Sequence, residues 1–458
     1  MAINPSIFKS YDIRGIYPTE INEETVFQIA KSIYQFVSQK INKTNPTILV
    51  GRDMRISSPS LFDVAKKALV EAGAKVIDAD LVSTPTFYFA VYSKGYDGGM
   101  QISASHNPKE YNGVKIVMNS PKGLIKIGKP TGMEDIKNLS LKGVNPKNSD
   151  GEISKLENIL EEEVQNSLKI TGNSQIKKFK IVADAANAMG ALYIDALFKK
   201  VPGNLIRMNF ELDGTFPVHQ PDPLQKETLF DLQKKVIEEK ADIGLAPDGD
   251  GDRHFFIDEK GEIVPPTIIT SIVARELLKK NPGETILVEI RYILTPQKIV
   301  EENGGKIEIT KVGHAFITEA MHKTGAIFAG ESSAHFYFRE TGGGESPMPV
   351  IVTVLSVMTR ENKKLSELVE ELRRSYESGE VNFKVSNALE IMQALKEKYK
   401  DGELSELDGI AARYPDWRFS VRTSNTEPLM RLNVEAIDKN VMEDKTDELI
   451  KLIESLKR

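Results

Sequence analysis

The sequence predicts an α/β protein made of several consecutive domains. Its 458 residues correspond to about three domains of ordinary size. Hydrophobic residues make up 40% and charged residues 28%, a composition typical of proteins that bury large cores. An apolar strand, a helix and a second strand follow one another at 47–53, 58–72 and 75–78, and strands of the same kind begin again at 179 and 285. This alternation indicates β-α-β units.

The composition also excludes several classes of function. The chain has no cysteine, which excludes disulfides, cysteine-ligated zinc and thiol catalysis. The net charge is −6 and the basic residues are spread along the chain, so we expect no nucleic-acid partner. No apolar run approaches the length of a membrane span, and the first residues lack the pattern of a signal peptide. We therefore expect a cytoplasmic protein with no membrane partner.

The first predicted domain begins with a turn and a helix and ends in polar sequence. Arg14 lies in an Arg-Gly turn, where its guanidinium can face an anion, and a helix is expected over 23–39. Residues 119–155 are rich in glycine, lysine, asparagine and proline. We expect them to form the end of the domain and a linker.

A polar loop at 101–108 interrupts the strand pattern of this domain. Most loop serines are turn or cap residues. Here, however, the Ser105 hydroxyl lies beside the His106 imidazole and ten residues before the Lys115 amine. This grouping makes the loop a candidate for chemistry.

The middle of the chain continues the alternation of helices and strands. Helices are expected over 226–240, 266–280 and 295–303, and strands over 285–291 and 306–310. Gly313 and His314 then open a further helix, where free backbone N–H groups suit a phosphate.

Two polar segments follow in the last third of the chain. After a strand expected at 326–329, a period of two would place Glu331, Ser333 and His335 on one side, where they can bind polyol hydroxyls. The alternative is a satisfied polar loop. A helix over 364–377 is expected to join the last domain. In that domain Arg422, Ser424, Asn425 and Thr426 form either a cradle of donors for an anion or an ordinary hairpin turn.

An acidic loop, 246–253, is the most specific feature of the sequence. Asp248, Asp250 and Asp252 alternate with glycines and precede Arg253, between two apolar runs that predict strand, loop and strand. Convergent carboxylates are costly unless a cation neutralises them, and their oxygens suit Mg²⁺ or Ca²⁺. Mg²⁺ in such a site usually also binds a phosphate oxygen.

Two other interpretations of the acidic loop are available. It can be a solvated surface turn, and it partly fits the EF-hand calcium loop, because Glu259 falls at the twelfth position. The EF-hand is disfavoured because Arg253 occupies the sixth position, where glycine is required, and because a strand precedes the loop.

Five separated loops together resemble the α-D-phosphohexomutases, the superfamily of phosphomannomutases and phosphoglucomutases. They lie, in the family's order, at 11–15, 103–108, 248–253, 330–335 and 422–428. The resemblance implies four domains in a heart-shaped arrangement. Three mixed α/β domains at 1–148, 149–256 and 257–368 would precede a TATA-binding-protein-like α+β domain at 369–458.

The resemblance also implies roles for the residues of these loops. Ser105 matches a serine carried as phosphoserine, whose phosphate would join Asp248, Asp250 and Asp252 around Mg²⁺. Arg253 matches an arginine near the transferred phosphoryl group. Lys115 and His335 match residues proposed for acid–base work, and His106 adjoins the serine. The expected substrate contacts are Arg14, Arg291, Gly313, His314, Glu331, Ser333, Arg422, Ser424, Asn425 and Thr426.

The activity that this resemblance implies is that of a phosphomannomutase, with glucose phosphates as further substrates. Mannose 6-phosphate and mannose 1-phosphate would interconvert through a hexose 1,6-bisphosphate that turns around in the site. Hexose phosphates would be the partners of a monomer or weak dimer. For Lys115 to accept the attacking hydroxyl's proton, its surroundings must lower its pKa.

Two other functions and three departures from the family pattern remain to be weighed. Segment 330–338 resembles the phosphomannomutase version of its loop more than that of phosphoglucosamine mutases, which are the alternative. A non-catalytic sugar-phosphate binder should have lost Ser105 or an aspartate of the acidic loop, and the chain keeps them. Ser103 stands where threonine is common and Arg291 where some relatives have lysine, and 341–347 lacks the usual aspartate-glycine pair.

Overall fold

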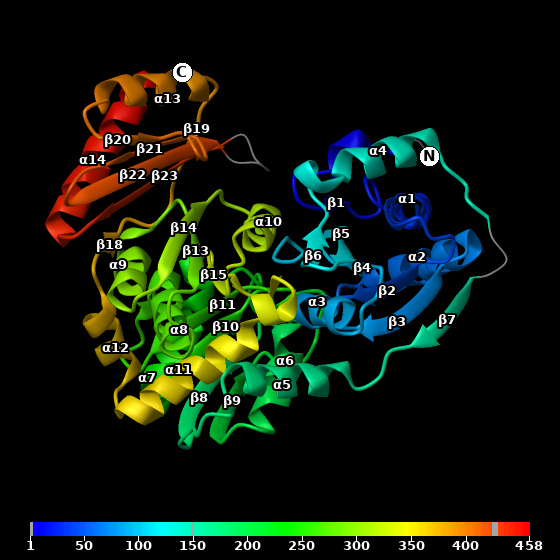
Figure 1. Ribbon diagram of the computed structural model, residues 1–458, viewed down its shortest axis with the longest axis horizontal. Coiled ribbons are helices and arrows are strands. Elements are labelled where there is room, and N and C mark those ends of the chain that lie inside the picture. The colour runs from blue at the N-terminus through cyan, green and yellow to red at the C-terminus, as the bar shows by residue number, and fades with distance from the viewer. Residues whose placement is uncertain (1–2, 148–150, 424–428) are drawn as a thin grey trace. The chain divides into compact units, whose positions relative to one another are not determined.

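The computed structural model describes residues 3–147, 151–423 and 429–458 (Figure 1). The chain divides into two compact units, each built from two segments. The first contains Met1–Val264 and Ser333–Glu367, and the second contains Pro265–Ser332 and Leu368–Arg458. Each unit is described by itself.

The first sheet of the first unit is mixed, with parallel pairs towards one edge and antiparallel pairs towards the other. Its order is β1 (Ile13–Ile16), β5 (Tyr111–Ser120), β4 (Gly98–Ile102), β2 (Thr47–Arg52), β3 (Lys75–Leu81) and β7 (Glu152–Lys155), with β6 (Gly123–Lys126) paired to β5. Strands β2, β3, β4 and β7 run parallel, whereas β1, β4 and β6 pair with β5 antiparallel. The predicted β-α-β grammar is therefore confirmed for this segment.

Helices pack on both faces of this sheet because its central strand alternates its buried side chains. Ile48 and Val50 of β2 join the core formed with α1 (Glu23–Ile41) and α2 (Ser58–Ala72), while Leu49 joins the core formed with α3 (Thr84–Ser93). Side chains of successive strand residues point to opposite faces, so an apolar run is what a sheet covered on both sides requires. Figure 1 shows α1 and α2 beside β2 and β3.

The segment 119–155, expected to form the end of the first domain and a linker, contains more regular structure than predicted. The segment contains the end of β5, strand β6, α4 (Met133–Lys142) and β7, all belonging to this first layer. Its glycines and prolines separate short elements. Leu124, Met133 and Ile136, which belong to these elements, are buried. Elements this short contain too few residues for an apolar periodicity to be recognised within polar sequence.

The second sheet of this unit carries the acidic loop. Its order is β12 (Ile263–Val264), β11 (His254–Asp258), β10 (Ile243–Pro247), β8 (Phe179–Asp184) and β9 (Gly203–Met208). Strands β8, β9 and β10 are parallel, and β10 and β11 form an antiparallel hairpin whose connection is the acidic loop. The helix expected at 226–240 begins as a 3-10 turn, Lys226–Leu229, before α7 (Phe230–Glu239).

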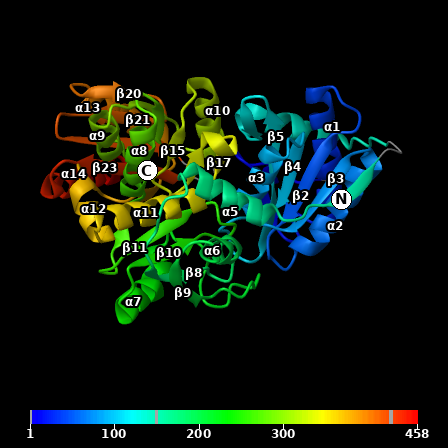
Figure 2. The same cartoon turned by 60° about the horizontal axis from the view of Figure 1, so that its bottom comes forward.

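A later segment of the chain completes the first unit. Strands β16 (Phe336–Phe338) and β17 (Gly344–Glu345) pair antiparallel, and α11 (Pro347–Glu361) follows them. Helix α11 packs against α5 (Ile159–Ile170) and α6 (Gly190–Phe198), as both views show (Figures 1 and 2). Residues 333–338 are thereby held in the same unit as the acidic loop.

The second unit begins with a further parallel α/β layer. Strand β13 (Thr285–Glu289) pairs in parallel with β14 (Lys306–Thr310) and β15 (Phe328–Gly330). The helices of this layer are α8 (Pro266–Lys280), α9 (Leu294–Glu302) and α10 (His314–Thr324). The predicted helix at 266–280 and strand at 306–310 have the same bounds in the structure.

The second sheet of this unit is antiparallel, with one apolar face and one polar face. Its order is β18 (Tyr376–Glu377), β23 (Leu429–Ala436), β22 (Trp417–Thr423), β21 (Ile410–Arg413) and β20 (Glu403–Ser405), with β19 (Val381–Lys384) paired to β23. Trp417, Phe419 and Val421 pack with α13 (Ala388–Lys398) and α14 (Lys439–Leu456) in one core. The period of two puts Arg418 and Arg422 on the other face.

The helix expected over 364–377 is shorter in the structure. Helix α12 spans Leu365–Leu372, and 376–377 form strand β18 instead. A charged run continues past the helix and has no apolar periodicity with which to mark its end. Within the described ranges, no helix is both long enough and apolar enough to cross a membrane.

Candidate active site

The three aspartates of the acidic loop converge on one point inside the first unit. Asp248 and Asp250 are fully buried and Asp252 is 5% exposed, and a carboxylate oxygen of each lies within 4.8 Å of the others. Asp248 is oriented by the loop itself, since its Oδ1 accepts hydrogen bonds from the backbone N–H groups of Gly251 (3.0 Å) and Arg253 (3.2 Å). Gly251 has φ +81°, a conformation that glycine adopts without strain.

The loop that carries Ser105, called the serine loop below, follows strand β4 and lies directly against the acidic loop. The Ser105 Oγ donates a 3.1 Å hydrogen bond to Oδ2 of Asp248 and lies 3.1 Å from Nδ1 of His106. Gly249 makes this approach possible, because a Cβ there would stand 2.3 Å from the carbonyl oxygen of Ser105. Ser105 itself is 3% exposed and has φ +52°, in the left-handed region that non-glycine residues rarely adopt.

The charges of the three aspartates in the acidic loop favour the binding of a cation. Burial and the charges of Asp252 and Asp250 raise the pKa of Asp248 to about 8. Oδ1 of Asp250 is buried and has no hydrogen-bond partner among the described residues. Buried carboxylate oxygens without a partner are costly, and oxygen ligands of this kind suit Mg²⁺. The donor set therefore fits a hard divalent cation.

Lys115, on β5, contacts the same carboxylates. Its Nζ donates to Oδ2 of Asp252 at 2.6 Å and to Oδ2 of Asp250. Burial disfavours its ammonium form, but Asp250 and Asp252 outweigh burial and hold the pKa of Lys115 well above its usual value. The lowered pKa that Lys115 would need in order to accept a proton is therefore not found here, because Lys115 faces two carboxylates that the sequence does not place beside it.

Arg253 and His335 lie at the opposite side of Asp252. His335 Nε2 is 3.4 Å from Arg253 Nε and 3.2 Å from Asp252 Oδ1, and its Nδ1 is 3.0 Å from Ser333 Oγ. An unprotonated Nε2 accepts from Arg253, whereas a protonated one donates to Asp252. The ring thus has a partner in either state.

Glu331, Ser333 and His335 were expected to share one side of an extended segment. This prediction is wrong, because the segment is not extended. Strand β15 ends at Gly330 and β16 begins at Phe336, and Ala334 between them has φ +65°. The segment is a turn, so the period of two does not apply. Ser333 and His335 meet through the turn itself.

Arg14 and His106 complete the group around the serine loop, and Arg14 lies within strand β1 rather than in the predicted turn. Arg14 Nε pairs with Asp12 Oδ2 at 2.7 Å, and its Nη1 donates to Oδ1 of Asn107. Burial, together with Arg253 and Arg14, lowers the pKa of His106 well below its usual value. The imidazole beside Ser105 is therefore neutral at neutral pH.

Three residues of this site were missed from the sequence. Thr84, at the start of α3, donates its hydroxyl to Oδ2 of Asp250 at 2.6 Å. Gln220 donates its side-chain N–H to the carbonyl oxygen of His106 at 2.9 Å. Arg55 donates to the carbonyl oxygen of Ser105 at 2.7 Å. The available signal was weak: Thr84 lies in a Ser-Thr-Pro helix start and Arg55 in a polar turn after a strand.

The other predicted residues lie in the second unit. Arg291 follows β13, and its Nε pairs with Glu289 Oε1 at 2.8 Å, while Nη2 lies 3.8 Å from Glu331 Oε1. The backbone N–H of Gly313, just before His314 and α10, donates to the same Glu331 oxygen at 3.2 Å. This carboxylate therefore links the turn after β13 to the start of α10.

The polar face of β22 carries Arg422, which is 4% exposed. Burial and the nearby charge of Arg291 lower the pKa of Arg422, so two cations lie within electrostatic range of one another. The charges of Asp408 and Glu380 act on this pKa in the opposite direction. Ser424, Asn425 and Thr426 fall outside the described residues.

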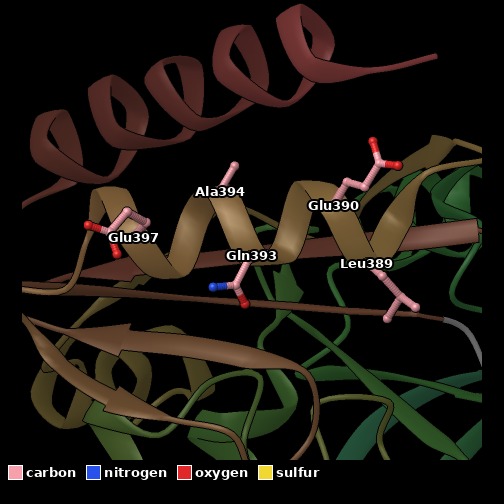
Figure 3. Close-up of a pocket in the computed structure, with 5 residues that line it drawn as sticks. All are labelled: Leu389, Glu390, Gln393, Ala394 and Glu397. Atoms are coloured by element: carbon pink, nitrogen blue, oxygen red, sulfur yellow. The ribbon is translucent and has the colours of Figure 1, made fainter.

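A separate hollow runs along α13. Figure 3 shows the side chains that line it: Leu389, Glu390, Gln393, Ala394 and Glu397. They include two carboxylates and no cationic or nucleophilic group. We assign this hollow no chemistry.

Comparisons with known proteins agree with this arrangement along the whole chain. The phosphoglucomutase/phosphomannomutase models for α/β/α domains I, II and III match residues 5–138, 160–261 and 265–376, and the model for the C-terminal domain matches 380–452. The chain is 38% identical to a phosphomannomutase of Methanocaldococcus jannaschii, covering 98% of each chain. It is 37% identical to one of Vibrio cholerae, again covering 98% of each.

A solved structure agrees with the fold. The crystal structure of a phosphoglucomutase/phosphomannomutase family protein from Burkholderia thailandensis superposes with a TM-score of 0.88 at 28% identity, covering 99% of this chain and 98% of that one. With four domain models matched in order and full-length relatives above 30% identity, this chain belongs to the phosphoglucomutase/phosphomannomutase family.

Proposed function

We propose that the protein is a phosphohexomutase that interconverts mannose 6-phosphate and mannose 1-phosphate and also accepts glucose phosphates. One observation carries the proposal. The Ser105 hydroxyl, held in a strained backbone conformation, contacts a buried cluster of three carboxylates that fits a divalent cation. A hydroxyl, a cation site and nearby Lys and Arg side chains are the parts that phosphoryl transfer needs. The relatives named phosphomannomutase support the choice of sugar.

The cation would be Mg²⁺, held by Asp248, Asp250 and Asp252. When bound, it would neutralise negative charge on the phosphoryl oxygens. The unpartnered oxygen of Asp250 and the raised pKa of Asp248 support this assignment, because a divalent cation would stabilise both carboxylates.

The chain's own residues would divide the remaining work. Ser105 would carry the phosphoryl group. In the first half-reaction the bond between phosphorus and Ser105 Oγ breaks and a bond from phosphorus to the sugar oxygen forms. The proton of the sugar hydroxyl ends on Oγ. Because the raised pKa of Lys115 keeps it protonated, we assign it to charge stabilisation and assign the proton transfer to His335.

The substrate's other phosphate would bind in the second unit. Arg291, Arg422 and the loop 424–426 would hold it, and Gly313, His314, Glu331 and Ser333 would contact the sugar. The hexose 1,6-bisphosphate formed in the first half-reaction would turn around and return a phosphoryl group to Ser105. We propose the division at 1–148, 149–256, 257–368 and 369–458 as the domains that carry these parts.

An assay on three sugars tests the proposal. Purified protein with Mg²⁺ and a trace of hexose 1,6-bisphosphate should convert mannose and glucose phosphates. Much faster conversion of glucosamine phosphate would instead make it a phosphoglucosamine mutase. Ser105→Ala should abolish turnover and the intact-mass gain of one phosphoryl group, whereas Ser60→Ala, on the exposed face of α2, should change neither. Full turnover by Ser105→Ala would refute the phosphoserine mechanism.

A further inference from the structure

Arg55 is a fully buried arginine that the proposed reaction does not use. It lies in the turn between β2 and α2, its side chain is 0% exposed, and it is among the largest completely buried side chains of the described chain. A buried guanidinium is retained at a large desolvation cost, so strong contacts must offset that cost. Those contacts lead to the serine loop.

The guanidinium binds backbone carbonyl oxygens of the serine loop. Its Nη2 donates to the carbonyl oxygens of Ser105 (2.7 Å) and Asn107 (2.5 Å). Its Nη1 donates to those of Pro108 (2.7 Å) and Tyr111 (3.0 Å). One side chain thus fixes four carbonyl oxygens within seven consecutive residues, a geometry that the planar fork of arginine provides.

Two neighbours hold this fork in place. Asp53, also 0% exposed, lies with Oδ2 3.2 Å from Arg55 Nε and accepts the backbone N–H of Arg55 on Oδ1 at 3.0 Å. The ring of Phe216 lies 5.1 Å from the guanidinium carbon, the geometry of a cation–π contact. The charge of Arg55 is therefore paired, and its plane is fixed from one side.

The conformation that these bonds fix is an unusual one. Ser105 has φ +52°, and a non-glycine residue keeps such a conformation only when its surroundings enforce it. Arg55 binds the carbonyl of Ser105 itself and the carbonyls that follow it. The direction of the Ser105 side chain, and so its 3.1 Å contact with Asp248, depends on this backbone.

We propose that Arg55 is a positioning residue for phosphoryl transfer, which holds the strained serine loop so that Ser105 Oγ points at the acidic cluster. We call the four hydrogen bonds from Arg55 to the serine loop the clamp. The inference rests on the proposed function for its catalytic consequence, but the clamp itself does not depend on that function. Lysine keeps the charge but has one nitrogen, so it cannot bind four carbonyl oxygens in the plane of a fork.

The test compares Arg55→Lys with Arg52→Lys. Arg52, three residues earlier at the end of β2, pairs with Asp80 at 2.8 Å. Hydrogen–deuterium exchange over residues 101–112 measures the clamp without any assay of activity. We expect exchange about tenfold faster in Arg55→Lys and unchanged in Arg52→Lys. Equal exchange in both variants would overturn the proposal.

The catalytic consequence has a separate readout. In Arg55→Lys the rate at which a hexose 1,6-bisphosphate phosphorylates Ser105, followed by intact mass, should fall about 100-fold together with kcat, the loss that a misplaced reacting group produces. KM should change less than about threefold, because Arg55 does not touch the sugar-phosphate contacts. A variant that loses thermal stability but keeps its kcat would show Arg55 to be structural only.

A second variant covers the case in which Arg55→Lys does not fold. Phe216→Leu removes the ring beside the guanidinium at a half-buried position and leaves the four hydrogen bonds. It should accelerate exchange over 101–112 about threefold and lower kcat by a similar factor. No change in either quantity would overturn the proposal. A wild-type protein without mutase activity would refute the proposed function, and the exchange measurement would still decide the clamp.

Discussion

Ser105 Oγ and Asp248 Oδ2 lie 3.1 Å apart, although in the proposed mechanism Ser105 would carry a phosphoryl group beside this carboxylate. The neutral Ser105 hydroxyl donates to this oxygen, while burial and the charges of Asp252 and Asp250 raise the pKa of Asp248 to about 8. A phosphoryl group on Ser105 would bring further negative charge to the same place. A divalent cation is the simplest way to hold both groups there.

The first prediction concerns that cation. Asp250→Asn keeps the shape of the side chain but removes one negative charge from the cluster. We expect the Mg²⁺ concentration for half-maximal turnover to rise at least about tenfold. Loss of a residue that only hydrogen-bonds to a metal ligand already lowers metal affinity by about this factor. Asp80→Asn, at an exposed carboxylate, is the control. An unchanged Mg²⁺ dependence in Asp250→Asn would exclude this residue as a ligand.

The second prediction concerns Gln220, which binds the carbonyl oxygen of His106, a carbonyl that Arg55 leaves free. Gln220→Ala should lower kcat about fivefold, which corresponds to the ~1 kcal/mol of one hydrogen bond. Gln233→Ala is a matched control, because Gln233 makes the same kind of bond to the carbonyl oxygen of Gly261 at 2.6 Å. If both variants lost activity equally, Gln220 would have no specific role at the serine loop.

Secondary structure was predictable where long elements have marked ends. The helix at 58–72 has the predicted bounds, and the strand β8 begins at the predicted residue 179, because their apolar patterns run between turn residues. The elements within 119–155 were not predicted, because they are short. The turn at 331–335 was not predicted either, because an alanine gives no sign in the sequence of the left-handed conformation that Ala334 adopts.

The electrostatics of the site could not be predicted from the sequence in the same way. The raised pKa of Lys115 depends on two carboxylates more than 130 residues away, at separations of 135 and 137. The proposed role of Arg55 depends on hydrogen bonds to carbonyl oxygens 50 to 56 residues away along the chain. A motif gives the type of residue, but a pKa and a hydrogen-bond fork are properties of tertiary packing.

The third prediction concerns pH and Glu163, a buried residue of α5. Burial raises its pKa to about 8, despite a hydrogen bond from Thr86 that lowers it. The folded state therefore holds a proton that the unfolded state releases above its ordinary pKa of 4.5. The stabilisation by the neutral form is complete below that value and is lost as pH rises through about 8.

The measurement is urea unfolding between pH 5 and 8, with Glu163→Gln compared with wild type. The free energy of unfolding of wild type should fall relative to the variant by ~1.4 kcal/mol per pH unit in this range. Glu157→Gln, at an exposed position, should follow wild type. Parallel pH profiles for wild type and Glu163→Gln would show that Glu163 is ionised in the folded protein.

The fourth prediction concerns a buried ion pair on the polar face of the β22–β23 sheet. Arg418 Nη1 and Glu435 Oε1 lie 2.7 Å apart, with side chains 3% and 1% exposed. Glu435 also accepts the backbone N–H groups of Ile293 (2.6 Å) and Leu294 (3.0 Å), while Arg418 donates to the carbonyl oxygen of Arg291 (2.9 Å). The pair therefore joins this sheet to the turn that carries Arg291.

Glu435→Ala should destabilise the second unit by about 3–5 kcal/mol, because it leaves a buried arginine without its counter-ion. Trp417, the only tryptophan of the chain, adjoins Arg418, so its fluorescence during urea unfolding reports on this unit. Glu443→Ala breaks an exposed pair with Lys439, whose side chains are 57% and 65% exposed, and should cost less than about 0.5 kcal/mol. The double variant Arg418→Met, Glu435→Leu should recover much of the loss, because it removes both charges together. Equal losses in Glu435→Ala and Glu443→Ala would contradict the assignment of Arg418 and Glu435 as a structural link to the Arg291 turn.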